Sequence, residues 1–260
     1  MTEDYREPDR SGEDTQDELI ASPFKRAFMV IVSPRRTFES LMAKSSRMDW
    51  IVPVVFMILA SLLVINTGWD YIRSEQISQS INRIENMNSL TGEQKDAQIA
   101  QIRQSADNLG TVSLVVANIA SVVGILASTA VIALVLMGIT RLLLGASLTF
   151  DSGFKITALS GMISCLGTLV ELPLMFVLES FSRSRFTLSL LLPSGMADSF
   201  LYQVMSIDLF SILYVVFLGI GLAVFTRKSL AGTLTPLVVL WLFFQVASVS
   251  LSSMLSGIGA

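Results

Sequence analysis

The ionisable residues that could do chemistry in this chain are few, and four of them lie in or between long apolar segments. Glu171 lies inside one apolar segment, and Asp208 stands at the entrance of the next. Arg183 and Arg185 belong to the loop between them. An acidic side chain at the centre of a bilayer costs up to about 2.5–3.5 kcal/mol, so each acid near lipid is expected to have a polar partner or a function.

Two interpretations of these residues are open. Glu171 and Asp208 could form a proton or cation site of the kind that small transporters use. Alternatively, Glu171 makes a structural helix contact that is hydrogen-bonded or neutralised by Arg183 or Arg185. No chain of polar groups continues inward from the two acids, and this favours the structural interpretation.

Other reactive groups are scarce. The chain has no His and a single Cys, Cys165, which lies in an apolar run and is typical of a small buried hydrophobe. Without His, most acid–base and nucleophilic schemes and histidine-ligated zinc sites are excluded. No GxxxxGK[ST] phosphate loop occurs, and no basic stripe with aromatic neighbours suggests nucleic acid. The sequence therefore predicts no catalytic residues, no metal, no cofactor and no enzymatic activity.

The composition places the chain in a membrane. Of 260 residues, 52% are hydrophobic and 15% are charged, where soluble domains carry roughly 25% charged residues. The mean hydropathy is +0.64. Five long segments are apolar enough to cross a bilayer, which takes about 20 residues. They cover residues 50–68, 111–140, 156–178, 207–226 and 231–253. The predicted fold is all-α, a polytopic bundle of five transmembrane helices within residues 50–255.

The distribution of basic residues predicts the orientation. With the N-terminus inside, the cytoplasmic segments hold 12 Lys and Arg residues and the opposite side holds 6. This bias predicts a cytoplasmic N-terminus and an extracytoplasmic C-terminus. The apolar stretch 186–193 is too short to cross and is expected to be a short helix or turn at the outer interface. No signal peptide opens the chain, so the first span is expected to direct it to the membrane.

The residues before the first span divide into two parts. Residues 1–20 contain eight acids within the first 18 positions and are expected to be disordered. Residues 21–49 are expected to form amphipathic helices, which begin at Ser22-Pro23 and Ser33-Pro34. Six basic residues in this part could hold these helices on an anionic leaflet, or the helices could pack on the bundle. The six are Lys25, Arg26, Arg35, Arg36, Lys44 and Arg47.

The loop at 70–110 is too long for a simple connector. Its apolar residues recur at helical spacing in two halves, and Thr91 with Gln94 between them has the spacing of a capping box. The loop is therefore predicted to be an extracytoplasmic helical hairpin. It could contact a partner outside the membrane or close on itself.

Small residues at helical spacing favour close helix packing. They occur as Ala117-x-x-x-Ser121, Gly124-x-x-x-Ser128, Ser160-x-x-x-Ser164 and the pair Gly219 and Gly221. Such patterns allow membrane helices to approach one another, within one bundle or between subunits.

Two stretches and the layout of the spans resemble the Yip-domain family, the Ypt/Rab-interacting membrane proteins, in its bacterial-type branch. Residues 33–41, SPRRTFESL, are similar to the family's Pro-basic-x-x-Phe segment before the first span. Residues 208–231 are similar to its Gly-containing fourth span and the basic turn that follows. The polar insert SLTGEQKDAQIAQIRQ looks like the helical insert of bacterial-type members.

The resemblance implies a non-enzymatic integral membrane protein of the bacterial cytoplasmic membrane. Some bacterial-type members accompany macrolide-export-like ABC transporters, and the outer insert favours that setting. The leading hypothesis is an accessory or scaffold protein for a membrane complex such as an efflux-type ABC transporter, with a membrane protein or a second copy as partner. The alternatives are a small proton- or cation-linked transporter that uses Glu171 and Asp208, and a trafficking factor that binds small GTPases.

Overall fold

The computed structural model describes residues 22–258 except for 88, 109, 182–185 and 188–206. The acidic tail predicted for residues 1–20, both loop arginines (Arg183 and Arg185) and most of the stretch 186–193 lie outside the described residues. The described part of the chain is all-helical, as predicted, with eight helices and one isolated β-bridge between Thr187 and Asp208. The helices are α2 (Pro23–Val32), α3 (Pro34–Ala43), α4 (Met48–Glu85), α5 (Gly92–Asn108), α6 (Gly110–Leu142), α7 (Phe150–Leu178), α9 (Leu209–Thr226) and α10 (Leu230–Ile258).

Five of these helices are long and apolar enough to cross a membrane, which confirms the five predicted spans by length and composition. They are α4, α6, α7, α9 and α10. At 1.5 Å per residue, the 38 residues of α4 extend about 57 Å, well beyond the roughly 30 Å hydrocarbon core. The first span and the first arm of the hairpin are therefore one continuous helix.

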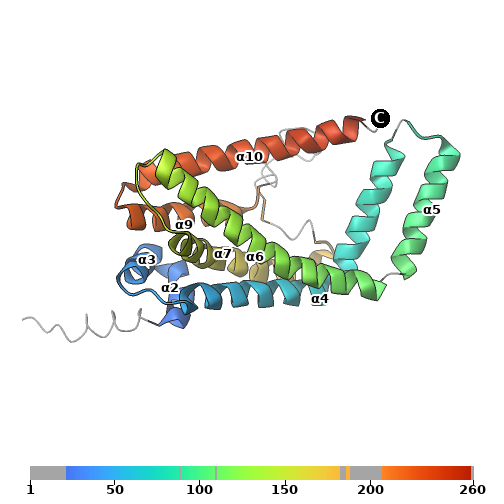
Figure 1. Ribbon diagram of the computed structural model, residues 1–260. Helices are drawn as coiled ribbons and strands as arrows, with labels where there is room; N and C mark the ends of the chain where they lie inside the picture. The colour runs from blue at the N-terminus through green and yellow to red at the C-terminus, as the bar shows by residue number, and fades with distance from the viewer. Residues whose placement is uncertain (1–21, 88, 109, 182–185, 188–206, 259–260) are drawn as a thin grey trace, which may run out of the picture.

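Helix α7 is the centre of the bundle. It packs against α4, α6 and α9, and its first half is almost entirely buried. The apolar core joins Ile156 and Leu159 of α7 to Leu136 of α6, Leu222 of α9 and Phe38 of α3. Helix α10 packs mainly on α9, and its distal part extends away from the core (Figure 1).

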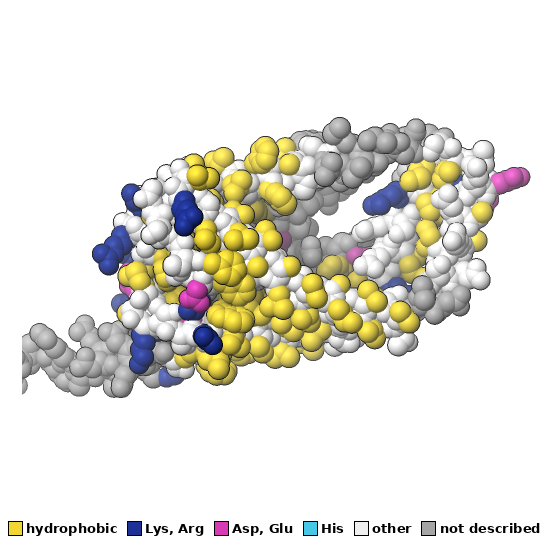
Figure 2. All heavy atoms as spheres, in the orientation of Figure 1, with side chains coloured by type: hydrophobic (Ala, Val, Ile, Leu, Met, Phe, Trp, Pro, Cys, Tyr) yellow, Lys and Arg dark blue, Asp and Glu magenta, His cyan; other side chains and the backbone are white. Residues whose placement is uncertain are grey.

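The two short N-terminal helices lie at one end of the bundle, and α10 ends near the opposite end (Figure 1). Phe38 and Leu41 of α3 are completely buried, so α3 packs on the bundle. Phe24 and Phe28 of α2 stay 61% and 53% exposed on the outside of the same layer. Figure 2 shows Lys and Arg side chains gathered at this end, next to a wide apolar band over the middle of the molecule.

The predicted hairpin consists of the end of α4 and the whole of α5, which lie side by side at the far end (Figure 1). The predicted capping box is confirmed. The Thr91 amide donates to Oε1 of Gln94 at 3.0 Å, and the Gln94 amide donates to Oγ1 of Thr91 at 3.4 Å. Across the hairpin, Nζ of Lys95 donates to the Glu85 carbonyl at 2.7 Å.

Candidate functional site

Glu171 lies in a cleft between helices in the half of the bundle nearer the hairpin. The cleft has a volume of about 400 Å³ and is lined by residues of α4, α6 and α7 together with Phe181. Its polar lining includes Ser61 and Gln76 of α4 and Thr168 of α7. Oε1 of Glu171 accepts a hydrogen bond from the Phe186 amide at 3.3 Å. The carboxylate is therefore half-buried in a polar cleft, which is how an acid can be accommodated near lipid.

Asp208 caps the N-terminus of α9. Its two carboxylate oxygens accept from the amides of Phe210 and Ser211 at 3.2 and 3.1 Å. An aspartate at this position satisfies amides that have no partner within the helix and interacts favourably with the helix dipole. The capping accounts for an acid at the entrance of this span.

The structure places Glu171 and Asp208 on either side of the same short segment. Asp208 forms the β-bridge with Thr187, and the Leu209 amide donates to the Phe186 carbonyl at 2.8 Å. The two carboxylates bind different backbone amides. A joint proton or cation site of Glu171 and Asp208 stays a prediction, as does the role of Arg183 and Arg185.

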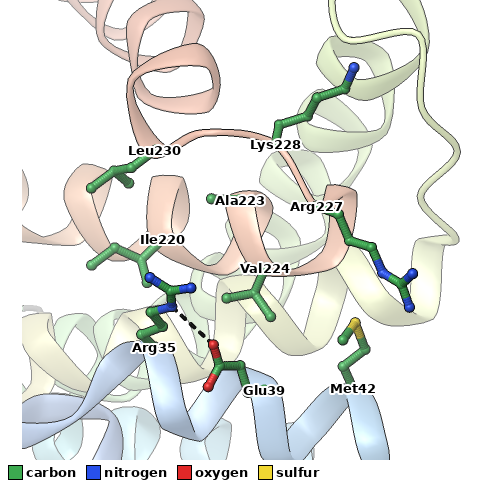
Figure 3. A pocket seen from close by; sticks show the side chains of 9 residues that line it. All are labelled: Arg35, Glu39, Met42, Ile220, Ala223, Val224, Arg227, Lys228 and Leu230. Carbon is green, nitrogen blue, oxygen red and sulfur yellow. Dashed lines mark hydrogen bonds and ion pairs between the residues drawn. The ribbon is translucent and has the colours of Figure 1, made fainter.

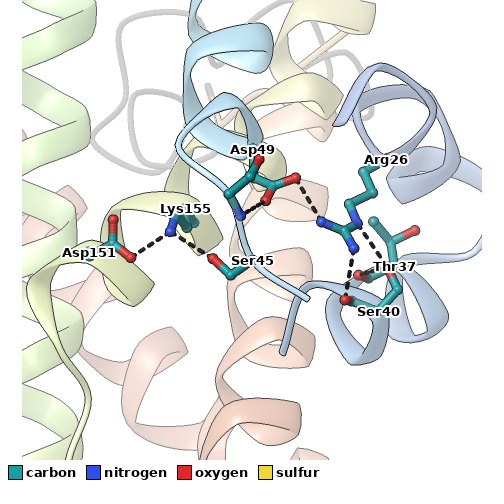
Figure 4. Close-up of polar contacts among 8 residues, drawn as sticks. Arg26, Thr37, Ser40, Ser45, Asp49, Asp151 and Lys155 are labelled. Atoms are coloured by element: carbon teal, nitrogen blue, oxygen red, sulfur yellow. Dashed lines mark hydrogen bonds and ion pairs between the residues drawn. The ribbon is translucent and has the colours of Figure 1, made fainter. Parts of the chain in front are cut away.

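A second polar centre, absent from the predicted sites, lies at the end that holds α2 and α3 (Figure 4). Nη1 of Arg26 donates to Oδ1 of Asp49 at 2.8 Å, and the two side chains are 1% and 0% exposed. Nε and Nη2 of Arg26 also donate to the hydroxyl and carbonyl of Ser40, at 3.0 and 2.9 Å. The second carboxylate oxygen of Asp49 accepts from the Ser46 amide at 2.6 Å. One buried pair thus fastens α2, α3 and the start of α4 together.

The burial of Arg26 corrects one expectation from the sequence. Arg26 was counted among six basic residues that could face an anionic leaflet, but its guanidinium is enclosed by protein. The reason is that Asp49, in the first turn of α4, supplies the countercharge inside the bundle. Without such a partner a buried charge would be prohibitively unfavourable.

Lys155 of α7 is a second buried cation at this end. Its Nζ donates to Oγ of Ser45 at 2.7 Å and to Oδ2 of Asp151 at 2.5 Å (Figure 4). Lys155 is 7% exposed, whereas Asp151 is 62% exposed. The lysine therefore ties the segment before α4 to the first turns of α7 and keeps its charge close to solvent.

Helices α4 and α6 are joined by two polar pairs within their apolar segments. The hydroxyls of Ser61 and Ser121 are 2.6 Å apart, and Nδ2 of Asn66 donates to Oδ1 of Asn118 at 3.0 Å. Paired side-chain amides and hydroxyls are a common way for membrane helices to stay in register. The Ser121 contact agrees with the close packing predicted from Ala117-x-x-x-Ser121.

The glycines of the small-residue patterns differ in whether they lie at a helix contact. A Cβ at Gly219 would lie 2.8 Å from Leu234, and a Cβ at Gly221 would lie 2.7 Å from Ile156, so both allow close helix approach as predicted. A Cβ at Gly124 would meet nothing within 4 Å. Gly124 therefore faces away from the helices that the structure describes.

These features position helices and present no catalytic arrangement. Among the described residues there is no group of three His, Cys, Asp or Glu side chains that could hold a metal ion. Cys165 is buried, and its sulfur lies 3.7 Å from the Phe56 carbonyl. The polar contacts described above join one helix to another, or a side chain to a helix end or loop.

Comparison with known proteins identifies the family. The family model of the Yip1 domain matches residues 28–249, which includes α3 to α9 and most of α10. No curated protein and no solved structure matches the chain. The matched region contains all five candidate spans, and the distal end of α10 extends beyond it on the C-terminal side. The chain belongs to the Yip1 domain family, a family of generally non-enzymatic membrane proteins, and is a multi-pass membrane protein.

Proposed function

We propose that this protein is a non-enzymatic accessory subunit that assists the assembly or regulation of a membrane complex, and that an efflux-type ABC transporter is its partner. The proposal further places the protein in a bacterial cytoplasmic membrane, as a bacterial-type member of its family. Its N-terminus is on the cytoplasmic side and its C-terminus outside. A second copy of the chain is the alternative partner.

The observation that carries the proposal is an open face of small residues on α6. Ala120, Gly124, Ala127 and Ser128 lie on one side of this helix and are all exposed. The neighbouring side of α6 carries Ser121 and Asn118, which bind α4. We call the first four residues the open α6 face.

Its composition is what favours a protein partner over lipid. Small side chains let two helix backbones approach closely, and van der Waals packing then drives association within the bilayer. A lipid-facing surface has no such requirement. Larger exposed side chains surround the open α6 face, among them Val123 and Val131 at 58% exposure each, and the exposed side of α10 carries Phe243 and Phe244 at 69% and 73%.

The two ends of the molecule offer further contacts with a partner. The hairpin of α4 and α5 extends the structure beyond the bundle at one end, and α2 with exposed Phe24 and Phe28 lies at the other. An accessory subunit with these parts would touch its partner within the membrane and on both sides of it.

Purification from native membranes tests the proposal. In mild detergent the tagged chain is expected to retain another membrane protein in a fixed ratio. Gly124→Ile, which adds bulk only to the open α6 face, is expected to release that protein and leave the tagged chain folded and monodisperse. Val239→Phe adds bulk to the exposed face of α10 and serves as the matched control. Recovery of the tagged chain alone, even after cross-linking in cells, would contradict the proposal.

A second candidate function, proton- or cation-linked transport, is favoured by the cleft around Glu171. The cleft of about 400 Å³ combines this carboxylate with Gln76, Ser61 and Thr168, which are groups that could contact a hydrated cation. Glu171→Gln would then abolish a proton- or cation-dependent flux in proteoliposomes. Full flux in the variant, or no flux in the unmodified protein, would remove this candidate.

A further inference from the structure

A cavity of about 480 Å³ lies between α3 and the turn that joins α9 to α10 (Figure 3). One part of its wall is apolar and consists mainly of Ile220, Val224 and Leu230. The other part is charged, with Arg35 and Glu39 on α3 and with Arg227 and Lys228 at the end of α9. The cavity therefore has two chemically distinct halves.

The charged half has an excess of positive charge. Nε of Arg35 and Oε1 of Glu39 form an ion pair at 2.9 Å, so these two charges balance. Within the described part of the chain, Arg227 and Lys228 form no ion pair with a carboxylate. In Figure 3 Arg227 lies beside Met42, on the other side of Glu39 from Arg35, and Lys228 extends away from Glu39. Two cations thus remain for an anionic ligand.

The backbone at Arg227 adopts a conformation that favours glycine. Arg227 ends α9 in the left-handed conformation, with φ 54° and ψ 33°. A helix end of this kind favours glycine, and another residue there costs about 1 kcal/mol or more. The Arg227 and Lys228 amides bind the Val224 and Ala223 carbonyls, so this strained turn places both residues in the wall of the cavity. A glycine would form the same turn without the strain.

The position of the cavity identifies the ligand class. Ile220 and Val224 belong to the last turns of a membrane span, whereas Arg227 and Lys228 follow that span immediately. The cavity therefore crosses the boundary between the hydrocarbon and headgroup layers. A phospholipid has its phosphate and its acyl chains on the two sides of this boundary, and basic pockets beside membrane helices are suited to such headgroups. A free phosphate would have no use for the apolar wall.

We propose that this cavity binds one anionic phospholipid, with an acyl chain against Ile220, Val224 and Leu230 and its phosphate between Arg227 and Lys228. The long side chains of these two residues point in different directions in Figure 3 and would turn toward the phosphate when the lipid binds. The lipid would fill the space between α3 and the α9–α10 turn. It would thereby fix the N-terminal helices to the last two spans. This inference concerns the lipid alone and does not depend on a protein partner.

Lipid binding to the purified, delipidated full-length chain tests the proposal. In neutral detergent, titration with short-chain phosphatidylglycerol is expected to saturate at one lipid per chain in native mass spectra. Each cation near a membrane surface contributes roughly fivefold in affinity, so Arg227→Gly with Lys228→Gln is expected to weaken binding about 30-fold. Arg36→Gln removes an exposed charge of α3 outside the cavity and is expected to leave binding unchanged.

The outcomes that would overturn the proposal are distinct. Equal losses in the double variant and in Arg36→Gln would mean a diffuse basic surface and no specific site. Competition by inorganic phosphate at comparable concentration would mean a soluble-anion site.

Glu39→Gln removes the one acid of the cavity and is expected to maintain or strengthen binding. A loss in this variant, with tighter binding of phosphatidylethanolamine by the unmodified chain, would reassign the cavity to a zwitterionic headgroup.

The variants are expected to fold, so a loss of binding can be assigned to the lost charge. Arg227→Gly relieves a strained backbone position, so the variant is expected to be at least as stable as the unmodified protein. Lys228→Gln alone leaves the turn unchanged and is expected to weaken binding about fivefold. Unchanged affinity in both single variants would contradict the proposal.

Discussion

Arg26 and Asp49 form a fully buried ion pair, with 2.8 Å between Nη1 and Oδ1, across 23 residues of sequence. Removing one partner of such a pair leaves an uncompensated charge inside the protein. Because this pair holds α2 and α3 on the bundle, its loss is expected to release the N-terminal helices first.

Asp49→Ala is therefore expected to destabilise the N-terminal layer by roughly 3–5 kcal/mol. The measurement is the thermal midpoint in detergent, together with the rate of proteolysis between α3 and α4. Arg35→Gln, which breaks the exposed pair with Glu39, is the matched control and is expected to cost no more than about 0.5 kcal/mol. Equal effects of the two variants would show that the buried pair is unimportant.

Gly167 is expected to tolerate no side chain. A Cβ there would lie 2.5 Å from Cγ of Phe210 and 3.0 Å from its Cβ, where α7 crosses α9. Gly167→Ala is expected to cost about 1–3 kcal/mol through overpacking, measured as a lower thermal midpoint in detergent. Gly124→Ala, at a position with open space, is expected to leave the midpoint unchanged or raise it. If Gly167→Ala were as stable as Gly124→Ala, the packing of α7 on α9 described above would be wrong.

The contact between α4 and α6 can be tested by cross-linking. In a chain with Cys165→Ala, the pair Ser61→Cys and Ser121→Cys is expected to form a disulfide on mild oxidation, because the native hydroxyls are 2.6 Å apart. The disulfide is read out as a mobility shift that reductant reverses. The control places the second cysteine at Ile119 instead of Ser121, because Ile119 is 60% exposed and lies on the opposite side of α6 from Ser121. Cross-linking of the control pair alone would mean that α6 is rotated about its axis.

The spans could be predicted because length and apolar composition decide them without tertiary information. Each predicted span corresponds to a helix, and Thr91 and Gln94 form their capping box because both partners lie within one turn. The predicted third span begins at residue 156, whereas α7 begins at Phe150. It begins ahead of the predicted span because Thr149 caps it through the Ser152 amide at 3.2 Å, and Lys155 then lies inside the helix.

The polar contacts between helices could not be predicted because they depend on the tertiary arrangement. Arg26 was expected among the basic residues of an amphipathic segment, and only the packing of α2 on α4 brings it to Asp49. Asn66 and Asn118 lie 52 residues apart, and nothing in the sequence links them. One signal was available, since Asn and Ser inside uncharged spans require hydrogen-bond partners. The cleft around Glu171 likewise needs α4 and α6 to form its walls.

The orientation in the membrane is testable with paired reporters. The basic residues of α2, α3 and the α9–α10 turn, together with Arg141 at the end of α6 and Lys155 near the start of α7, favour the cytoplasm for this end of the bundle. Fusions after Ala260 are therefore expected to give active alkaline phosphatase and no green fluorescence. Fusions at Met1 are expected to fluoresce. A fluorescent fusion after Ala260 would mean that the chain crosses the membrane an even number of times or lies in the reverse orientation. Either result would contradict five spans with a cytoplasmic N-terminus.

The most direct test of the accessory-subunit proposal is photo-cross-linking from the open α6 face in native membranes. A photoreactive amino acid in place of Ala127 is expected to join this 28.4 kDa chain to another membrane protein, identified by mass spectrometry. The same amino acid in place of Leu136, which is buried against the bundle, is expected to give no intermolecular product. A product between two copies of the chain would assign the open α6 face to a homo-oligomer. Adducts with lipid alone from position 127 would contradict the proposed function.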